Sequence, residues 1–128
     1  MAHSVFENQP WQPHQDYLLQ RLNGAPVVSA VQALSRFHYV VQRPGKTELV
    51  LYLTNKYILS VADVIEILEE APETNCIAST MAYNQYSPEA KAHCMELGVG
   101  LFRVVELLGA VYYDGDRFLA YVLPERSQ

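Results

Sequence analysis

Histidine and cysteine are the residue types in this chain that most often act in catalysis or bind metals. His38 lies in a predicted strand, with neither an acid nor a nucleophile beside it in the sequence. We interpret it as a partly buried, hydrogen-bonded histidine rather than a catalytic base. His3, His14 and His93 have no zinc-binding spacing. The sequence therefore predicts no metal site.

Cys76 and Cys94 are the only cysteines, and neither belongs to a Cys-x-x-Cys or Cys-His pattern. Cys76 falls in a strand pattern and Cys94 on the apolar side of a helix pattern, so we expect buried free thiols in a reduced cytoplasm rather than a disulfide. The first residues lack the basic and apolar regions of a signal peptide. No apolar run approaches the ~20 residues that span a bilayer. We expect a cytoplasmic protein without membrane contact.

Phosphate-binding motifs are missing from the sequence. Neither the P-loop pattern nor Gly-x-Ser-x-Gly occurs, and Gly98-Val99-Gly100 lacks the third glycine of the dinucleotide fingerprint and precedes a strand. A basic stretch at 36–56 contains four cations against one acid, Glu48; the cations are Arg36, Arg43, Lys46 and Lys56. They could touch a few phosphates, which predicts only weak, salt-sensitive binding to nucleic acid.

Negative charge dominates the rest of the chain. The formal net charge is −5, and between Lys56 and Lys91 there are six acids without a basic residue. We interpret these acids as a solvated helix face. A docking face for a basic partner is the alternative.

The loop Tyr83-Asn84-Gln85-Tyr86 follows a predicted buried strand at 75–82. Strand ends of α/β sheets commonly form a ligand crevice, so this loop is a candidate binding site, and a small-molecule sensor is one functional hypothesis. The chain also has nine tyrosines. Tyrosine covers contact area at low entropic cost, so several of them could line a protein interface.

The elements follow from the periodicity of apolar residues. We expect an irregular arm at 1–13, one domain at 14–124 and a tail at 125–128. Within the domain the predicted helices are 16–22, 58–71 and 88–97, with a helical turn at 106–108. The predicted strands are 27–34, which could instead be helical, then 36–42, 47–54, 75–82 and 99–105. Asp114-Gly115 between 111–113 and 118–123 predicts a hairpin.

This order, α-β-β-β-α-β-α-β, predicts an α/β fold with a mixed sheet and helices on both faces. The order resembles the restriction-endonuclease-like fold, particularly its Mrr-type branch. The matching stretches are IASTMAYNQYSPEAKAHCMELG at 77–98 and VGLFRVVELLGA at 99–110. The resemblance covers roughly residues 74–111 and implies a role in DNA processing or defence.

Nucleases of this family place an Asp on the second core strand and an (Asp/Glu)-x-Lys triplet on the third, where the carboxylates bind Mg²⁺ and the lysine positions the nucleophile. Residues 36–42 contain no carboxylate, and Glu48 is followed by valine at position 50 where lysine is needed. Lys56 has no acid two residues before it. The resemblance therefore implies a member whose metal site is missing.

We expect a non-catalytic protein-interaction or regulatory module, without a cofactor, inside a DNA-processing or defence assembly. Its partner is expected to be a protein, and a homodimer could form through an edge strand or the C-terminal hairpin. The alternative is a divergent Mg²⁺-dependent nuclease that uses Glu48, Lys56 and His38. The candidate binding residues are Tyr83, Asn84, Gln85, Tyr86, Arg36, Arg43 and Lys46.

Overall fold

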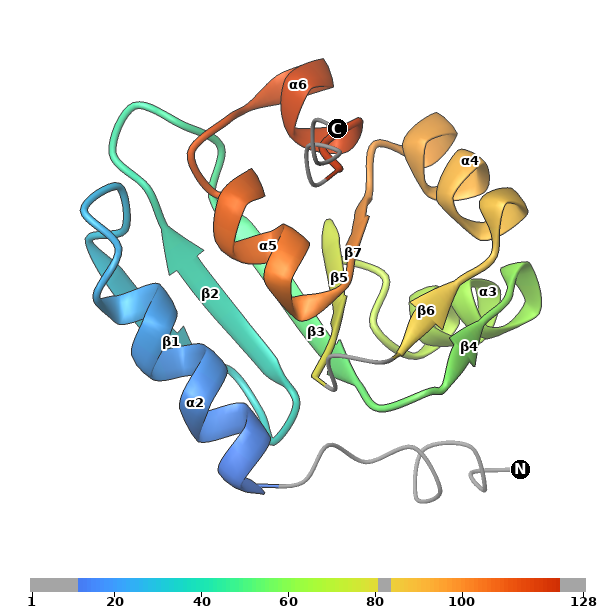
Figure 1. The fold of residues 1–128 in the computed structure, drawn as a ribbon, viewed down its shortest axis with the longest axis horizontal. Coiled ribbons are helices and arrows are strands. Elements are labelled where there is room, and N and C mark those ends of the chain that lie inside the picture. The colour runs from blue at the N-terminus through green and yellow to red at the C-terminus, as the bar shows by residue number, and fades with distance from the viewer. Residues whose placement is uncertain (1–11, 81–83, 123–128) are drawn as a thin grey trace, which may run out of the picture.

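A five-stranded mixed sheet forms the centre of the molecule (Figure 1). The computed structural model describes residues 12–80 and 84–122. The strands lie in the order β1-β2-β3-β5-β7, with β1 and β2 antiparallel to their neighbours and β3, β5 and β7 parallel. Their bounds are β1 Ala30–Ala33, β2 His38–Gln42, β3 Leu49–Thr54, β5 Cys76–Ser79 and β7 Gly100–Phe102. This sheet confirms the predicted α/β class.

Helices cover both faces of the sheet (Figure 1). One face packs against α3 (Val61–Glu70) and α4 (Pro88–Leu97), through a core cluster that contains Val64, Cys94 and Ile77. The other face packs against α2 (Gln12–Asn23), α5 (Val104–Ala110) and α6 (Gly115–Leu119). Covering the sheet on both sides explains why its central strands are almost continuously apolar.

Successive side chains of β3 enter opposite core clusters. Leu51 and Leu53 face α2 and α5, whereas Tyr52 faces α3 and α4. All three are less than a tenth exposed. Each such burial contributes about 1.5–3 kcal/mol, so the alternation fixes the register of the whole sheet.

Local sequence signals define both crossover helices. Ser60 and Asp63 form a capping box at the start of α3, with Ser60 N donating to the Asp63 carboxylate at 2.9 Å. Ser87 caps α4 by accepting from Ala90 N at 3.0 Å, and Gly98 ends that helix at a φ of 75°. The predicted bounds of α4 are confirmed.

The predicted C-terminal hairpin is wrong, because residues 115–119 form α6. Helical geometry carries Phe118 into the core, where its ring lies 5.0 Å from that of Phe102 in an edge-to-face contact. Gly115, at a φ of 62°, provides the turn into this helix. Packing of one aromatic residue thus outweighs the local preference of Asp114-Gly115 for a two-residue turn. Because residues 115–119 are helical, they cannot form the hairpin through which a homodimer was expected. The other expected dimer surface, an edge strand, is present as β1.

Two further differences from the prediction concern short elements. A second, two-stranded parallel sheet joins β4 (Ile58–Leu59) to β6 (Gln85–Tyr86), in segments that we expected to be helix and loop. The first helix, α2, begins at Gln12 and so takes in the end of the expected arm. Two-residue strands lack any detectable period, which is why the sequence did not reveal them.

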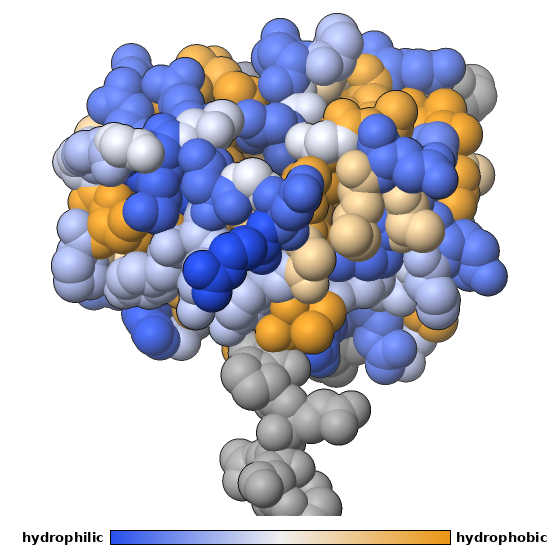
Figure 2. Space-filling view, turned by 90° about the horizontal axis from the view of Figure 1, so that it is seen from above, coloured by the Kyte–Doolittle hydropathy of each residue, from blue (hydrophilic) through white to orange (hydrophobic). Residues whose placement is uncertain are grey.

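Exposed apolar side chains are spread over several elements of the described surface, including Leu34, Ile58, Ile65 and Leu97. Figure 2 views the molecule from the side of the β2–β3 turn and α6, where hydrophilic residues cover much of the face with apolar residues between them. Among the described residues, no helix has the length and apolar character needed to cross a bilayer.

Candidate functional site

The carboxyl ends of the parallel strands β3, β5 and β7 meet at the lower edge of the sheet in Figure 1. In register, Thr54 of β3 lies beside Ser79 of β5. Ala78 pairs with Phe102, so Ser79 also lies beside Arg103, whose φ of −78° and ψ of 162° continue the extended chain. Alternation along β3 and β5 directs the Thr54 and Ser79 side chains to the α3/α4 face, and the extended backbone of Arg103, one residue past β7, favours the same direction. We call Thr54, Ser79 and Arg103 the edge row.

Two hydroxyl groups at this edge are buried without a hydrogen-bond partner among residues 12–80 and 84–122. Ser79 is 7% exposed and Thr80 is 6% exposed, and neither hydroxyl bonds to any described residue. Burying an unsatisfied polar group costs about 1–3 kcal/mol. Unsatisfied buried polar groups are rare in proteins, and they are expected at functional or strained sites, where selection for function offsets the lost stability.

A buried carboxylate lies next to the edge row. Glu106 of α5 is 3% exposed and accepts hydrogen bonds from the Tyr86 hydroxyl, at 2.9 and 3.1 Å, and from Arg103 N, at 2.9 Å. The Arg103 guanidinium forms an ion pair with it at 3.6 Å. Burial, together with the hydrogen bond to Glu106, raises the pKa of Tyr86 well above its usual value. Tyr86 therefore stays a neutral donor to Glu106 at physiological pH.

Lys91 of α4 completes this charged group. Its Nζ donates to the Leu101 carbonyl of β7 at 2.7 Å and lies 4.3 Å from the centre of the Phe102 ring. Burial lowers the pKa of Lys91, whereas the nearby Glu106 opposes that shift. The lysine thereby satisfies a carbonyl of an edge strand and adds a second cation near the edge row.

The predicted loop contributes to the same edge. Asn84 is 1% exposed and donates to the Asn55 side chain at 3.1 Å. Gln85 is exposed, and its backbone N donates to the Tyr57 carbonyl at 2.8 Å. Tyr86 binds Glu106. Tyr83 lies outside the described residues. The structure therefore brings three of the four predicted loop residues to the carboxyl edge.

The residues of the nuclease alternative lie apart from one another. Glu48 directly precedes β3 and Lys56 follows it, so the six residues of that strand separate them. The Lys56 ammonium is paired with Asp63 at 3.6 Å. His38 packs edge-on against Tyr52, and its Nδ1 lies 2.7 Å from the Ser35 hydroxyl. In the part of the chain that the structure describes, no three His, Cys, Asp or Glu side chains come together as a metal site would need.

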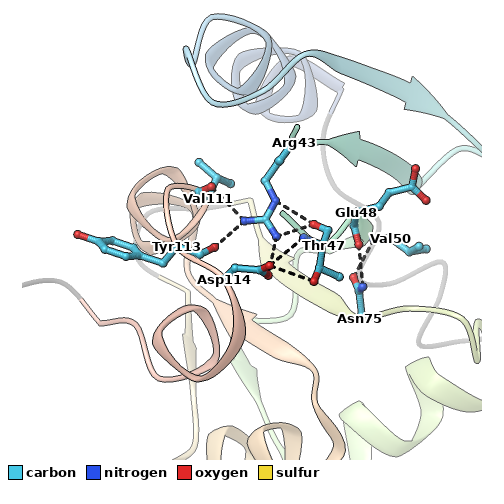
Figure 3. A network of polar contacts seen from close by, with 8 residues as sticks. All are labelled: Arg43, Thr47, Glu48, Val50, Asn75, Val111, Tyr113 and Asp114. Atoms are coloured by element: carbon cyan, nitrogen blue, oxygen red, sulfur yellow. Dashed lines mark hydrogen bonds and ion pairs between the residues drawn. The ribbon is translucent and has the colours of Figure 1, made fainter. Parts of the chain in front are cut away.

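Four cations were expected to touch phosphates; Lys56 pairs with Asp63, and the other three have different environments. Arg36 is exposed, and Lys46 is partly exposed in the β2–β3 turn. Arg43 is 3% exposed, and its guanidinium binds protein acceptors (Figure 3). It donates to the Val111 carbonyl at 3.0 Å, to the Thr47 carbonyl at 2.6 Å and to the Asp114 carboxylate at 3.3 Å. Arg43 therefore joins the turn to the C-terminal helices instead of facing solvent.

Sequence reasoning missed six members of the site: Thr54, Ser79, Thr80, Lys91, Arg103 and Glu106. A pair of hydroxyl residues at the end of an apolar strand was the only available signal, and such pairs are common. Arg103 and Glu106 were hidden in the run from Val99 to Leu108. The parallel pairing of β5 with β7 brings the start of α5, which carries both residues, to the edge where Ser79 lies.

Comparisons with known proteins add no relative: no family model, no curated protein and no solved structure matches this chain.

Proposed function

We propose that this chain is a non-catalytic regulatory module that binds a small polar ligand at the carboxyl edge of its parallel strands. The observation that carries the proposal is the pair of buried hydroxyls, Ser79 and Thr80, without partners among the described residues. In open α/β sheets, ligands bind outside the carboxyl ends of the strands. Both hydroxyl oxygens are closed to solvent in this structure, so a ligand reaches them, and removes their desolvation penalty, when this edge opens locally.

The separation of Glu48 from Lys56 supports binding rather than hydrolysis. Metal-assisted cleavage needs carboxylates that converge on one ion and a group that positions water. Here Lys56 pairs with Asp63, and Glu48 lies beside the Gln42 amide at 3.5 Å at the opposite end of β3. Together with the resemblance of 77–110 to restriction-endonuclease-like proteins, this supports a regulatory subunit that works with a protein partner in a DNA-processing assembly.

The proposal predicts that the Ser79 hydroxyl lowers the stability of the free protein and strengthens ligand binding. Replacing Ser79 by Ala removes an unsatisfied hydroxyl and should stabilise the free protein by about 1 kcal/mol, while it weakens ligand binding. Thr74→Val is the matched control. Thr74 is 4% exposed, and its hydroxyl also lacks a described partner, but it precedes β5 at the opposite edge of the sheet.

The experiment measures thermal unfolding of the full chain with a panel of sugars, nucleosides, amino acids, carboxylic acids and nucleotides. A ligand at a hundred times its Kd stabilises by ~2.7 kcal/mol, which raises Tm by several degrees. We expect at least one compound to do so with wild type and with Thr74→Val, and to lose most of its effect with Ser79→Ala. If no compound raises Tm, or if Ser79→Ala lowers the stability of the free protein, the proposal is wrong.

A further inference from the structure

We infer that this protein forms a symmetric homodimer in which the edge strand β1 pairs antiparallel with β1 of a second copy. The inference goes beyond the proposed ligand site and does not depend on it. The five-stranded sheet has two edge strands, β1 and β7, and β1 is the outermost strand on the left of Figure 1. An edge strand presents backbone N–H and C=O groups to which another strand can bond.

The first argument is that β1 has free backbone groups on its outer side. Leu34 N donates to the His38 carbonyl at 2.9 Å, and the backbone groups of successive residues in a strand point in opposite directions. Ala30 and Gln32 therefore bond to β2, whereas the groups of Val31 and Ala33 point away from the sheet. Within residues 12–80 and 84–122, nothing bonds to the outward N–H and C=O groups of Val31 and Ala33.

The second argument is that the other edge strand is protected. Gly100 N donates to the Asn75 carbonyl at 2.9 Å, so Gly100 bonds to β5 and the next residue, Leu101, points its backbone groups outward. The Lys91 Nζ donates to that Leu101 carbonyl at 2.7 Å. Lysine at a sheet edge is one of the devices that prevent strand pairing, and proline is another. β1 contains neither residue, which leaves it as the edge that can accept a strand.

The third argument is the lack of charge along β1. Residues 25–35, APVVSAVQALS, contain no Asp, Glu, Lys or Arg, although the whole chain has a net charge of −5. In a symmetric antiparallel pair, a charged residue at the centre faces the same charge on the second copy, which is destabilising. The nearest charged residues in the chain, Arg21 and Arg36, lie outside this stretch. The open edge therefore carries no charge that would repel a second copy.

The fourth argument is that β1 is complementary to itself. The outward groups bond when Val31 lies opposite Ala33 of the second copy, and each such pair exchanges two hydrogen bonds. This register places Gln32 on the two-fold axis, opposite Gln32 of the second copy, where the two amides can bond to each other. It also places Leu34, which is 54% exposed, opposite the small side chain of Ala30. Pairing thus covers an exposed leucine without a steric conflict between two large residues.

Dimerisation through β1 leaves the carboxyl edge accessible in both copies. β5 and β7, which lead to Ser79 and Arg103, lie at the other side of the strand order from β1. One strand pair buries less than the ~1,600 Å² of a standard interface, so we expect weak association with a Kd in the micromolar range. Such a Kd predicts mostly monomer at about 5 µM and a measurable dimer at about 500 µM.

The test measures sedimentation equilibrium of the full chain over this concentration range. Gln32→Lys places two like charges opposite each other, and Gln32→Glu does the same with the other sign, so each should weaken dimerisation by about tenfold or more. An equal mixture of the two variants should restore the dimer, because opposite charges then meet. Restoration also shows that both variants are folded.

Leu97→Lys is the matched control. Leu97 is as exposed as Leu34, at 54%, but lies at the end of α4, just before β7, so this variant should dimerise like wild type. Hydrogen exchange identifies the strand that pairs: the amides of Val31 and Ala33 should exchange more slowly at high protein concentration, because they are bonded only in the dimer.

A chain that stays monomeric at the highest concentration would overturn the inference. A dimer that Gln32→Lys leaves intact, a mixture of the two Gln32 variants that stays monomeric, or equal weakening by Leu97→Lys would overturn it as well. None of these results bears on the ligand site, which the thermal panel tests separately.

Discussion

Replacing Arg43 by Ala should destabilise this protein more than almost any other single charge removal. The Arg43 side chain is 0% exposed, and its guanidinium donates to three backbone carbonyls and one carboxylate. These acceptors belong to the β2–β3 turn and to the segment between α5 and α6, up to 71 residues further along the chain (Figure 3). Loss of the guanidinium should therefore loosen the docking of α6.

The magnitude follows from the groups left behind. The carbonyls of Thr47, Val111 and Tyr113 lose donors at 2.6–3.0 Å; the Val111 hydrogen bond is buried and the other two are partly buried. A fully buried acceptor without a partner costs about 1–3 kcal/mol, and a partly buried one costs less. Asp114 loses its cation but keeps the hydrogen bond from Thr47 N at 2.9 Å, and it is 35% exposed, so its contribution is small. Water entering the vacated space will recover part of the loss. We expect a net cost of about 3–5 kcal/mol, as for one-sided removal of a buried charge pair.

Urea unfolding monitored by far-UV circular dichroism measures this cost. Domains of this size are typically stable by about 5–15 kcal/mol, so the variant should still fold at low urea, with a much lower midpoint and an unchanged slope. Arg43→Lys should recover a minority of the loss, because an ammonium cannot reach all four acceptors. Arg36→Ala is the control, since Arg36 is exposed beside the Phe37 ring and should change stability by less than about 0.5 kcal/mol.

A loss below about 1 kcal/mol for Arg43→Ala, with an unchanged slope, would refute this reasoning. It would mean that the carbonyls find other donors or that Arg43 is not buried in solution. A phosphate-binding role for Arg43 would then regain support, because an accessible guanidinium is what such a role needs.

Three further predictions concern other contacts. Burial alone would raise the pKa of Asp114, but hydrogen bonds from Thr47 and the charge of Arg43 lower this pKa overall. The Asp114 carboxylate therefore stabilises the fold above its unfolded pKa, and this stabilisation is lost as pH falls through the folded pKa. The difference in urea midpoint between wild type and Asp114→Asn should shrink from pH 6 to pH 2, and a constant difference would contradict this. Ser60→Ala removes the cap of α3 and should cost about 1 kcal/mol by urea unfolding; no measurable loss would mean that the cap is not formed. Gly100→Ala places a Cβ 2.6 Å from the rings of Phe102 and Phe118 and should cost about 1–3 kcal/mol, whereas an unchanged Tm would show that the rings move aside freely.

The candidate site was predictable only in part. The loop 83–86 was expected to bind because it follows a buried strand, and Asn84, Gln85 and Tyr86 do lie at the carboxyl edge. Arg43 was expected among the binding residues, yet its side chain is enclosed by backbone carbonyls. The sequence around Arg43, with Pro44 and Gly45 next to it, describes an exposed turn and carries no sign of the segment that covers it.

The sequence by itself determined the elements whose signals lie within a few residues. Ser60 with Asp63, and Ser87 with Gly98, mark the ends of α3 and α4, because caps act between neighbouring residues. Runs of β-branched and aromatic residues likewise predicted β2 and β3, because strands that are covered on both faces are apolar almost throughout.

Only the tertiary structure decided the rest. Asp114-Gly115 became the start of a helix because Phe118 packs on Phe102 and Asp114 binds a turn 67 residues earlier. The edge row exists because parallel pairing brings residues of β3, β5 and β7 into register. Local preferences differ by about 1 kcal/mol or less, whereas burial of one aromatic side chain is worth more, so contacts between distant segments override them.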